Sequence, residues 1–135
     1  MEYRIEDIDG VGPVLRKRLE MVGIETTHQL LEACGSPRGR RETSEATGVS
    51  EAVLLRWANI ADLMRIHGIG KQFSELLEAS GVDTVKELKT RDAESLAIKM
   101  KEVNRNRRFA RTLPSVERVF DWVEKAKKLN PVITH

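Results

Sequence analysis

Apolar residues recur three and four positions apart along much of the chain, which is the spacing of one face of an α-helix. The pattern is clearest in residues 61–88. An apolar helical pattern stops there at Gly68-Ile69-Gly70, and a second one begins directly after it. Because glycine enters tight turns without the steric cost of a Cβ, we expect two helices joined by a glycine turn. The second helix carries Phe73, Leu76 and Leu77 on its apolar face.

Several residues favour the start of a helix, because Ser, Thr and Asp side chains accept hydrogen bonds from the free amides of a first turn. Gln29 and Glu87 each lie three positions after a threonine and predict capping boxes. The pattern leaves open whether the helix after Ser50 runs on to Ile66 or breaks near Asn59. The predicted capping residues are Thr26, Ser36, Ser50, Thr84, Asp92 and Ser115.

The pattern of residues 61–88 occurs a second time in the chain. A shift of 58 positions aligns Gly10 with Gly68 and Gly12 with Gly70, and the alignment needs no gap. Such repeats indicate units whose apolar faces need one another. Later in each copy, a tryptophan follows a capping serine by seven positions, at Trp57 and at Trp122.

We therefore expect an all-α fold of two units from an internal duplication, packed as one compact helical domain. The first unit spans residues 1–60, the second 61–130, and a brief tail 131–135. Only 4% of the residues are aromatic and few runs alternate apolar with polar residues, so no sheet is expected. Both tryptophans lie at helical spacing from aliphatic residues, which favours core packing over base stacking. A helix over residues 13–22 is expected to direct inward Val14, Leu15, Leu19 and Val22.

The two glycine turns lie in similar octapeptides, Ile8-Asp9-Gly10-Val11-Gly12-Pro13-Val14-Leu15 and Ile66-His67-Gly68-Ile69-Gly70-Lys71-Gln72-Phe73. Both resemble the helix-hairpin-helix module of DNA repair, recombination and replication proteins. Over nearly its full length, the chain is similar to a bacterial family of small tandem helix-hairpin-helix proteins, a domain of unknown function. The resemblance implies a fold more firmly than a function.

The resemblance also implies a ligand, because helix-hairpin-helix turns hold DNA backbone phosphates with their amides and do not read bases. Successive N–H groups beside a helix N-terminus form an anion site, to which the helix dipole adds positive potential. Contacts of this kind position a protein without giving sequence specificity. The residues implied at the turns are Gly10, Val11, Gly12, Gly68, Ile69 and Gly70, and the flanking cations are Arg16, Lys17 and Lys71.

A basic cluster provides a second candidate contact with nucleic acid. The net charge is only +2, but residues 99–111 contain six basic residues and one acid. Arginine makes charge-assisted and bidentate hydrogen bonds to phosphates. The candidate residues are Arg105, Arg107, Arg108 and Arg111. We expect sequence-independent binding of double-stranded DNA if these arginines share a face with the two turns.

The alternative is a protein-interaction or scaffold module that keeps the fold without binding DNA. In that case the glycines only permit the tight turns, and the charged residues form a solvated surface. Two features favour it: Arg16 stands where DNA-binding modules have a small residue, and acids gather around the second turn. Those acids are Glu75, Glu78, Asp83 and Glu87.

The remaining expectations are absences. The sequence has no P-loop, HExxH or GxSxG motif, so we expect no enzyme activity and no cofactor. Its three histidines lack metal-ligand spacing, and its one cysteine, Cys34, excludes an internal disulfide. Neither a signal peptide nor a long apolar run is present, so we expect a cytoplasmic protein without membrane contact. The sequence leaves the oligomeric state open, and we favour a monomer.

Overall fold

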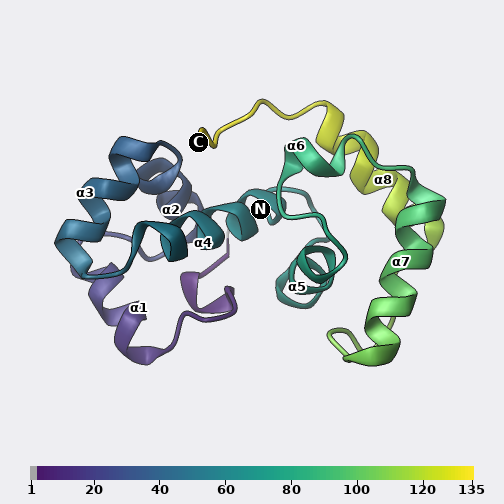
Figure 1. The fold of residues 1–135 in the computed structure, drawn as a ribbon, viewed down its shortest axis with the longest axis horizontal. Coiled ribbons are helices and arrows are strands. Elements are labelled where there is room, and N and C mark those ends of the chain that lie inside the picture. The colour runs from purple at the N-terminus through teal and green to yellow at the C-terminus, as the bar shows by residue number, and fades with distance from the viewer. Residues whose placement is uncertain (1–2) are drawn as a thin grey trace.

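The computed structural model describes residues 3–135, and these form eight α-helices and one short 3-10 helix (Figure 1). Over this range no strand forms, and one isolated bridge pairs Arg4 with Thr26. The all-α prediction is therefore confirmed. The helices are η1 (Ile5–Asp7), α1 (Pro13–Glu20), α2 (Thr27–Cys34), α3 (Pro37–Thr47), α4 (Glu51–Leu63), α5 (Lys71–Ala79), α6 (Val85–Leu88), α7 (Ala93–Asn106) and α8 (Val116–Lys127).

The predicted helix starts are confirmed, because each of the six capping side chains accepts a hydrogen bond from an amide in its first turn. The capping box of Thr26 is complete, since the Gln29 side chain also accepts from the Thr26 N–H. The box of Thr84 is only half formed. The Glu87 N–H donates to Thr84, but the Glu87 carboxylate pairs with Arg91 at 3.0 Å. Because the Glu87 carboxylate pairs with Arg91, one turn further on, it does not accept from the Thr84 N–H as a full capping box requires.

Helix α1 corrects part of the predicted core. Leu19 is fully buried, whereas Val14 and Val22 are 66% and 42% exposed. The prediction was wrong for Val22 because α1 ends at Glu20, which leaves Val22 in the turn that follows. It was wrong for Val14 because the buried stripe of this short helix runs through Leu15 and Leu19, about 100° around the helix from Val14.

Helix α4 lies in the middle of the molecule and packs against α2, α3 and α5 (Figure 1). It passes Asn59 without a break but ends at Leu63, three residues before Ile66, so neither of the two alternatives left open by the sequence holds in full. Its last residues serve two clusters of buried side chains. Ala61 belongs to the cluster of the first half and Leu63 to that of the second, so the two cores meet on α4.

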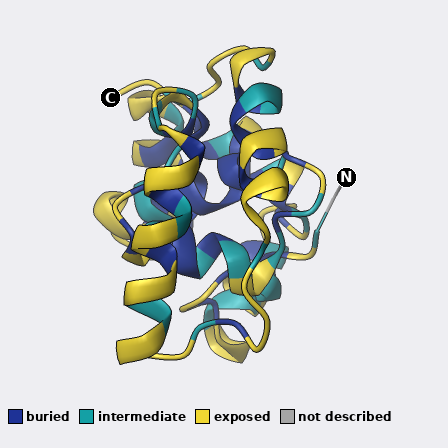
Figure 2. Ribbon diagram, turned by 90° about the vertical axis from the view of Figure 1, so that its right-hand side faces the viewer, coloured by how far each residue is buried: buried dark blue, intermediate teal, exposed yellow. Residues whose placement is uncertain are grey.

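Each core is built around one tryptophan. Trp57 packs among the residues of η1, α1, α2 and α4, and Trp122 among those of α5 to α8. Both are 1% exposed, so their predicted place in the core is confirmed. Figure 2 shows the buried residues gathered between the helices and the exposed ones on the outer faces.

Residues 130–135, called the C-terminal strap below, lead from α8 back to the first half (Figure 1). The Thr134 N–H donates to the carbonyl of Gly35, which lies between α2 and α3. The residues predicted as a brief tail are thus joined to the other half of the molecule.

Candidate nucleic-acid interface

The two glycine turns have the same backbone geometry. Gly10 and Gly68 both have φ of +97°, a value that side chains on L-residues rarely adopt. In the first turn the Val11 N–H donates to the Ile8 carbonyl, and in the second the Ile69 N–H donates to Ile66, both over 3.1 Å. Each turn is therefore closed by its own hydrogen bond.

The side chains between the glycines point inward. Val11 is 7% exposed and Ile69 is fully buried. Their amides are occupied by the hydrogen bonds that close the turns, and the Gly12 N–H donates to the Gly10 carbonyl over 3.2 Å. Of the amides that the resemblance implied, those of Gly10, Gly68 and Gly70 donate to no other described residue, and further open donors lie directly after the turns.

Those donors belong to the first turns of α1 and α5. Within residues 3–135, these are the two α-helices whose N-terminus no side chain caps. The first intrahelical bonds are donated by Arg16 and Ser74, to Gly12 and Gly70. The amides before them have no partner inside the helix. They belong to Val14 and Leu15 in α1, where Pro13 has no N–H, and to Lys71, Gln72 and Phe73 in α5.

The surroundings of the two turns differ. At Gly12 an added Cβ would meet no atom within 4 Å, so this turn opens directly to its surroundings. At Gly70 an added Cβ would lie 3.5 Å from the hydroxyl oxygen of Tyr3. Tyr3 is fixed to the first half, because its carbonyl accepts from the Thr27 N–H over 2.8 Å. A side chain of the first half thus borders the second turn.

The cations beside the turns are used unequally. Arg16 pairs with Glu6 at 3.4 Å and with Glu20 at 3.6 Å. Lys17 and Lys71 are exposed. Surface ion pairs of this kind contribute little and exchange readily, so Arg16 remains accessible to another anion.

The candidate arginines 105, 107, 108 and 111 are all exposed. Asn104, which the sequence analysis did not single out, shapes the loop that carries them. Its Oδ1 accepts from the amides of Phe109 and Ala110, and its Nδ2 donates to the Ala110 carbonyl. After α7 ends at Asn106, the Asn104 side chain thus supplies the hydrogen bonds that hold the backbone of the loop. The Arg107 guanidinium lies 4.9 Å from the ring centre of Phe109.

Charges from both turns and from the basic loop converge on Glu75. Burial raises the pKa of the Glu75 carboxyl, and Asp9 of the first turn raises it further. Lys71 after the second turn, Arg107 of the basic loop and Arg56 lower it. Contacts join the same parts of the molecule, because Arg56 pairs with Asp9 at 3.4 Å and with Glu78 of α5 at 2.9 Å, and α5 packs against α7.

Two arginines missed by the sequence analysis lie beside the glycines. Arg56 donates to the Asp9 carbonyl over 3.2 Å, and pairs with Glu78 at 2.9 Å. Arg118 lies over the rings of Phe73 and Trp122, 5.3 Å and 5.7 Å from their centres. No spacing in the sequence pairs either arginine with a turn, because Arg56 lies 47 positions after Asp9.

The structure shows few other groups suited to chemistry. In the described residues no three His, Cys, Asp or Glu side chains gather in a way that could hold a metal ion. Cys34 is fully buried, and burial raises the pKa of its thiol. A helix long and apolar enough to cross a membrane is not found anywhere in residues 3–135.

The protein is thus an all-α protein in which two α-helices of residues 3–135, α1 and α5, begin without a side-chain cap and the loop after α7 carries exposed arginines. Over residues 9–129 the chain matches the family described as "Domain of unknown function (DUF4332)", and it belongs to that family. No curated protein and no solved structure matches it.

Proposed function

We propose that this protein binds double-stranded DNA through its phosphates, without reading sequence and without catalysis. The observation that carries the proposal is the pair of uncapped helix starts at α1 and α5. The other six α-helices of residues 3–135 satisfy an amide of their first turn with their own side chain. In α1 and α5, directly after the two glycine turns, the chain instead leaves such donors open.

Electrostatics support the same reading. A helix N-terminus carries the equivalent of roughly half a positive charge, and open amides point toward an approaching anion. Lys71 and Arg107 both act on Glu75, so the second turn and the basic loop are near neighbours. In Figure 1 the loop after α7 and helix α1 both lie toward the lower edge of the molecule. A duplex lying along this side would meet both turns and the basic loop.

The repeated geometry supports a second proposal, that the two halves arose by internal duplication of a helix-hairpin-helix unit. Both turns share the same φ at their first glycine. In both, a tryptophan Nε1 lies 3.2 to 3.3 Å from where a Cβ of that glycine would be. The equivalence thus extends from the sequence of the turns to the residues that pack on them.

A protein-interaction module is the alternative, and an apolar surface on α8 favours it. Phe120 is 56% exposed and lines a hollow of about 430 Å³ between α8 and the start of α7, with Val116 beside it. Acids also lie among the cations of the proposed interface, at Asp9, Glu75 and Glu78. This function would leave the open amides without a role.

The direct test is binding of a fluorescein-labelled duplex, followed by anisotropy at about 50 and 200 mM salt. Each phosphate contact contributes a slope of about −0.9 to the dependence of log affinity on log salt. Four contacts would thus weaken binding about 150-fold over this range. Absence of binding at 50 mM salt would exclude DNA as the direct ligand and leave the protein-interaction module.

A further inference from the structure

The C-terminal strap joins the two halves of the molecule by hydrogen bonds at both of its ends. At the far end, the Thr134 N–H donates to the Gly35 carbonyl over 2.8 Å, and the Thr134 carbonyl accepts from Arg40 Nη2 over 2.7 Å. Both backbone groups of Thr134 are therefore paired with the first half. At the near end, Arg65 Nη2 donates to the Asn130 carbonyl over 3.1 Å.

Arg40 is the unusual residue in this contact. It is 5% exposed, although arginine is rarely buried unless its charge and its N–H donors are satisfied. Its Nη1 donates to the carbonyls of Cys34 and Gly35, over 3.0 and 3.2 Å. The acceptor for Nη2 is the strap carbonyl of Thr134. Removing the strap would leave part of a buried cation without a partner, which is costly.

The surface that receives the strap is shaped for close approach of a backbone. A Cβ added at Gly35 would lie 2.4 Å from the Val132 carbonyl oxygen, closer than real Cβ contacts come. Ile133 packs against the core of the first half, and Leu129 against the core of the second. Ile133 thus adds an apolar contact to the hydrogen bonds of the strap, and Leu129, which directly precedes the strap, fixes its start to the second core.

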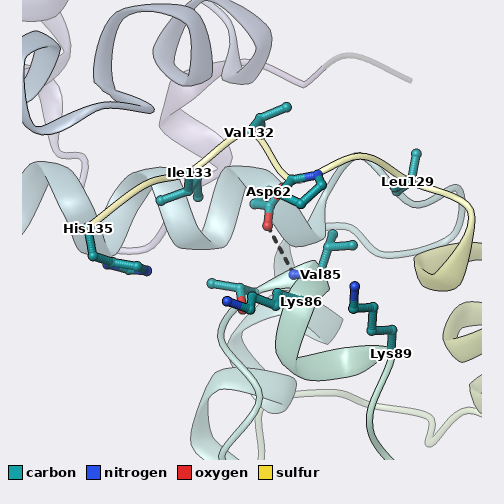
Figure 3. A pocket seen from close by; sticks show the side chains of 10 residues that line it. Asp62, Val85, Lys86, Lys89, Leu129, Val132, Ile133 and His135 are labelled. Carbon is teal, nitrogen blue, oxygen red and sulfur yellow. Dashed lines mark hydrogen bonds between the residues drawn. The ribbon is translucent and has the colours of Figure 1, made fainter.

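The near end of the strap is tied to the entry of the second glycine turn. Arg65 precedes Gly68 by three positions and is held by Asp62, whose Oδ1 accepts from Arg65 Nε over 2.9 Å. Asp62 Oδ2 accepts from the Val85 N–H at the start of α6 over 3.0 Å. Figure 3 shows this bond, with Val132 and Ile133 of the strap passing over it.

The geometry points to the strap as a latch, with Arg40 as its receptor, that holds the second half in a fixed position relative to the first. The latch reaches from the junction of α2 and α3 to the residues that enter the second turn. Opening it would remove one of the contacts that fix the two glycine turns relative to each other, beside α4, the Tyr3 side chain at Gly70 and the Arg56–Glu78 ion pair. The inference stands independently of nucleic-acid binding, because every contact in it lies within the chain.

The test is hydrogen exchange of the Thr134 amide, measured by NMR on the full chain. Closed local contacts protect an amide from exchange. We expect protection of this amide in the native protein, and exchange at least about tenfold faster in Arg40→Ala, since hydrogen bonds to charged groups are the stronger ones. The matched control is Arg41→Ala, an exposed neighbour on the same helix. It should leave the Thr134 exchange unchanged.

A native Thr134 amide that exchanges at the rate of a free peptide would overturn the latch. So would an Arg40→Ala protein that stays folded and exchanges this amide at the native rate. Because Arg40 also bonds within the α2–α3 junction, a second variant, Thr134→Pro, removes the strap N–H that donates to Gly35 and keeps the carbonyl that accepts from Arg40. The melting temperature should fall less in the double variant than the two single losses add up to, because both hydrogen bonds hold the same end of the strap and the loss of either one releases it. Additive losses would contradict the latch.

Discussion

Gly68 lies against the indole of Trp122, so that a Cβ added to this glycine would be 3.2 Å from Nε1. Gly10 has the same relationship with Trp57, at 3.3 Å. In each half the helix that bears the tryptophan comes late in the sequence, yet it packs on the turn that opens the half. Each turn is therefore packed directly against the core of its half. Glycine is required there for two reasons, the positive φ and the closeness of the indole.

Alanine at either glycine should destabilise the protein. Gly10→Ala and Gly68→Ala each place a Cβ at a φ of +97° and press it against an indole. Backbone strain of this kind costs about 1–3 kcal/mol, and the contact adds to it. Urea denaturation followed by circular dichroism measures the loss.

Gly23→Ala is the matched control for these variants. Gly23 also has a positive φ, of +83°, but an added Cβ would meet no atom within 4 Å. This variant should show the backbone cost alone, and thus a smaller loss than the other two. Equal losses at all three positions would contradict a role for the tryptophan contact.

The basic loop should contribute to the salt dependence of DNA binding. Replacing Arg108 and Arg111 with Gln should reduce the slope of log affinity against log salt by about 0.9 for each phosphate contact removed. Titrations at several salt concentrations measure the slope. Replacing Arg38 and Arg41 removes the same charge from α3 and should leave the slope unchanged. Equal effects of the two pairs would mean that only net charge matters.

Glu75 should oppose DNA binding at neutral pH, because its carboxylate lies among the cations of the interface. We expect Glu75→Gln to tighten binding by about threefold at low salt, the order of magnitude of one screened charge interaction. Glu45→Gln on α3 removes the same charge elsewhere and serves as the control. Weaker binding of Glu75→Gln would contradict the position assigned to the interface.

The raised pKa of Glu75 also makes the stability of the protein depend on pH, and Glu75→Gln should remove this dependence. Burial in the first place, and Asp9 in the second, raise the pKa of Glu75 above 4.5, so the ionised form is disfavoured in the folded chain. The free energy of unfolding of the native protein should therefore fall as the pH rises from 4.5 through the raised pKa, because Glu75 ionises less favourably in the folded chain than in the unfolded one. Glu75→Gln should therefore be the more stable protein at pH 7, and the difference should vanish below pH 4.5. Thermal melts across this range test the sign.

The helix boundaries could be predicted from the sequence because they depend on neighbours along the chain. A serine or threonine caps the amides three positions after it, whatever the rest of the molecule does. The capping box at Thr84 failed for the same local reason, since Glu87 has a closer partner in Arg91. The exposed Val14 shows the limit of periodicity, which finds a helix but not the width of its buried stripe.

The structural features of the proposed interface could be predicted only in part, because several of them depend on residues far apart in the sequence. The glycine turns were recognised, but the resemblance assigned the phosphate contacts to amides that the turns use themselves, at Val11 and Ile69. A usable signal was present: neither Gly12 nor Gly70 has a side chain to cap the helix that follows. Arg40 had no such signal, since one of the acceptors that its buried guanidinium needs, the Thr134 carbonyl, lies 94 positions away.

Gly12→Asp should separate stability from binding. Gly12 has φ of −82° and ψ of 178°, in the same extended region as the natural N-caps Asp92 and Ser115, and nothing lies within 4 Å of an added Cβ. The new carboxylate should accept from the open amides of α1, so stability should hold or rise by a few tenths of a kcal/mol. The melting temperature of the variant checks this. A fall of several degrees would mean that the site is not open.

The most direct test of DNA binding by the glycine turns is the affinity of Gly12→Asp for a labelled duplex at about 50 mM salt, measured by anisotropy beside the native protein and Gly12→Ala. The aspartate both occupies the open amides and repels phosphate, so binding should weaken by at least about tenfold without loss of stability. Gly12→Ala leaves the amides open and should bind within about twofold of the native protein, a change of less than 0.5 kcal/mol. Native affinity in a stably folded Gly12→Asp protein would show that the first glycine turn does not bind DNA.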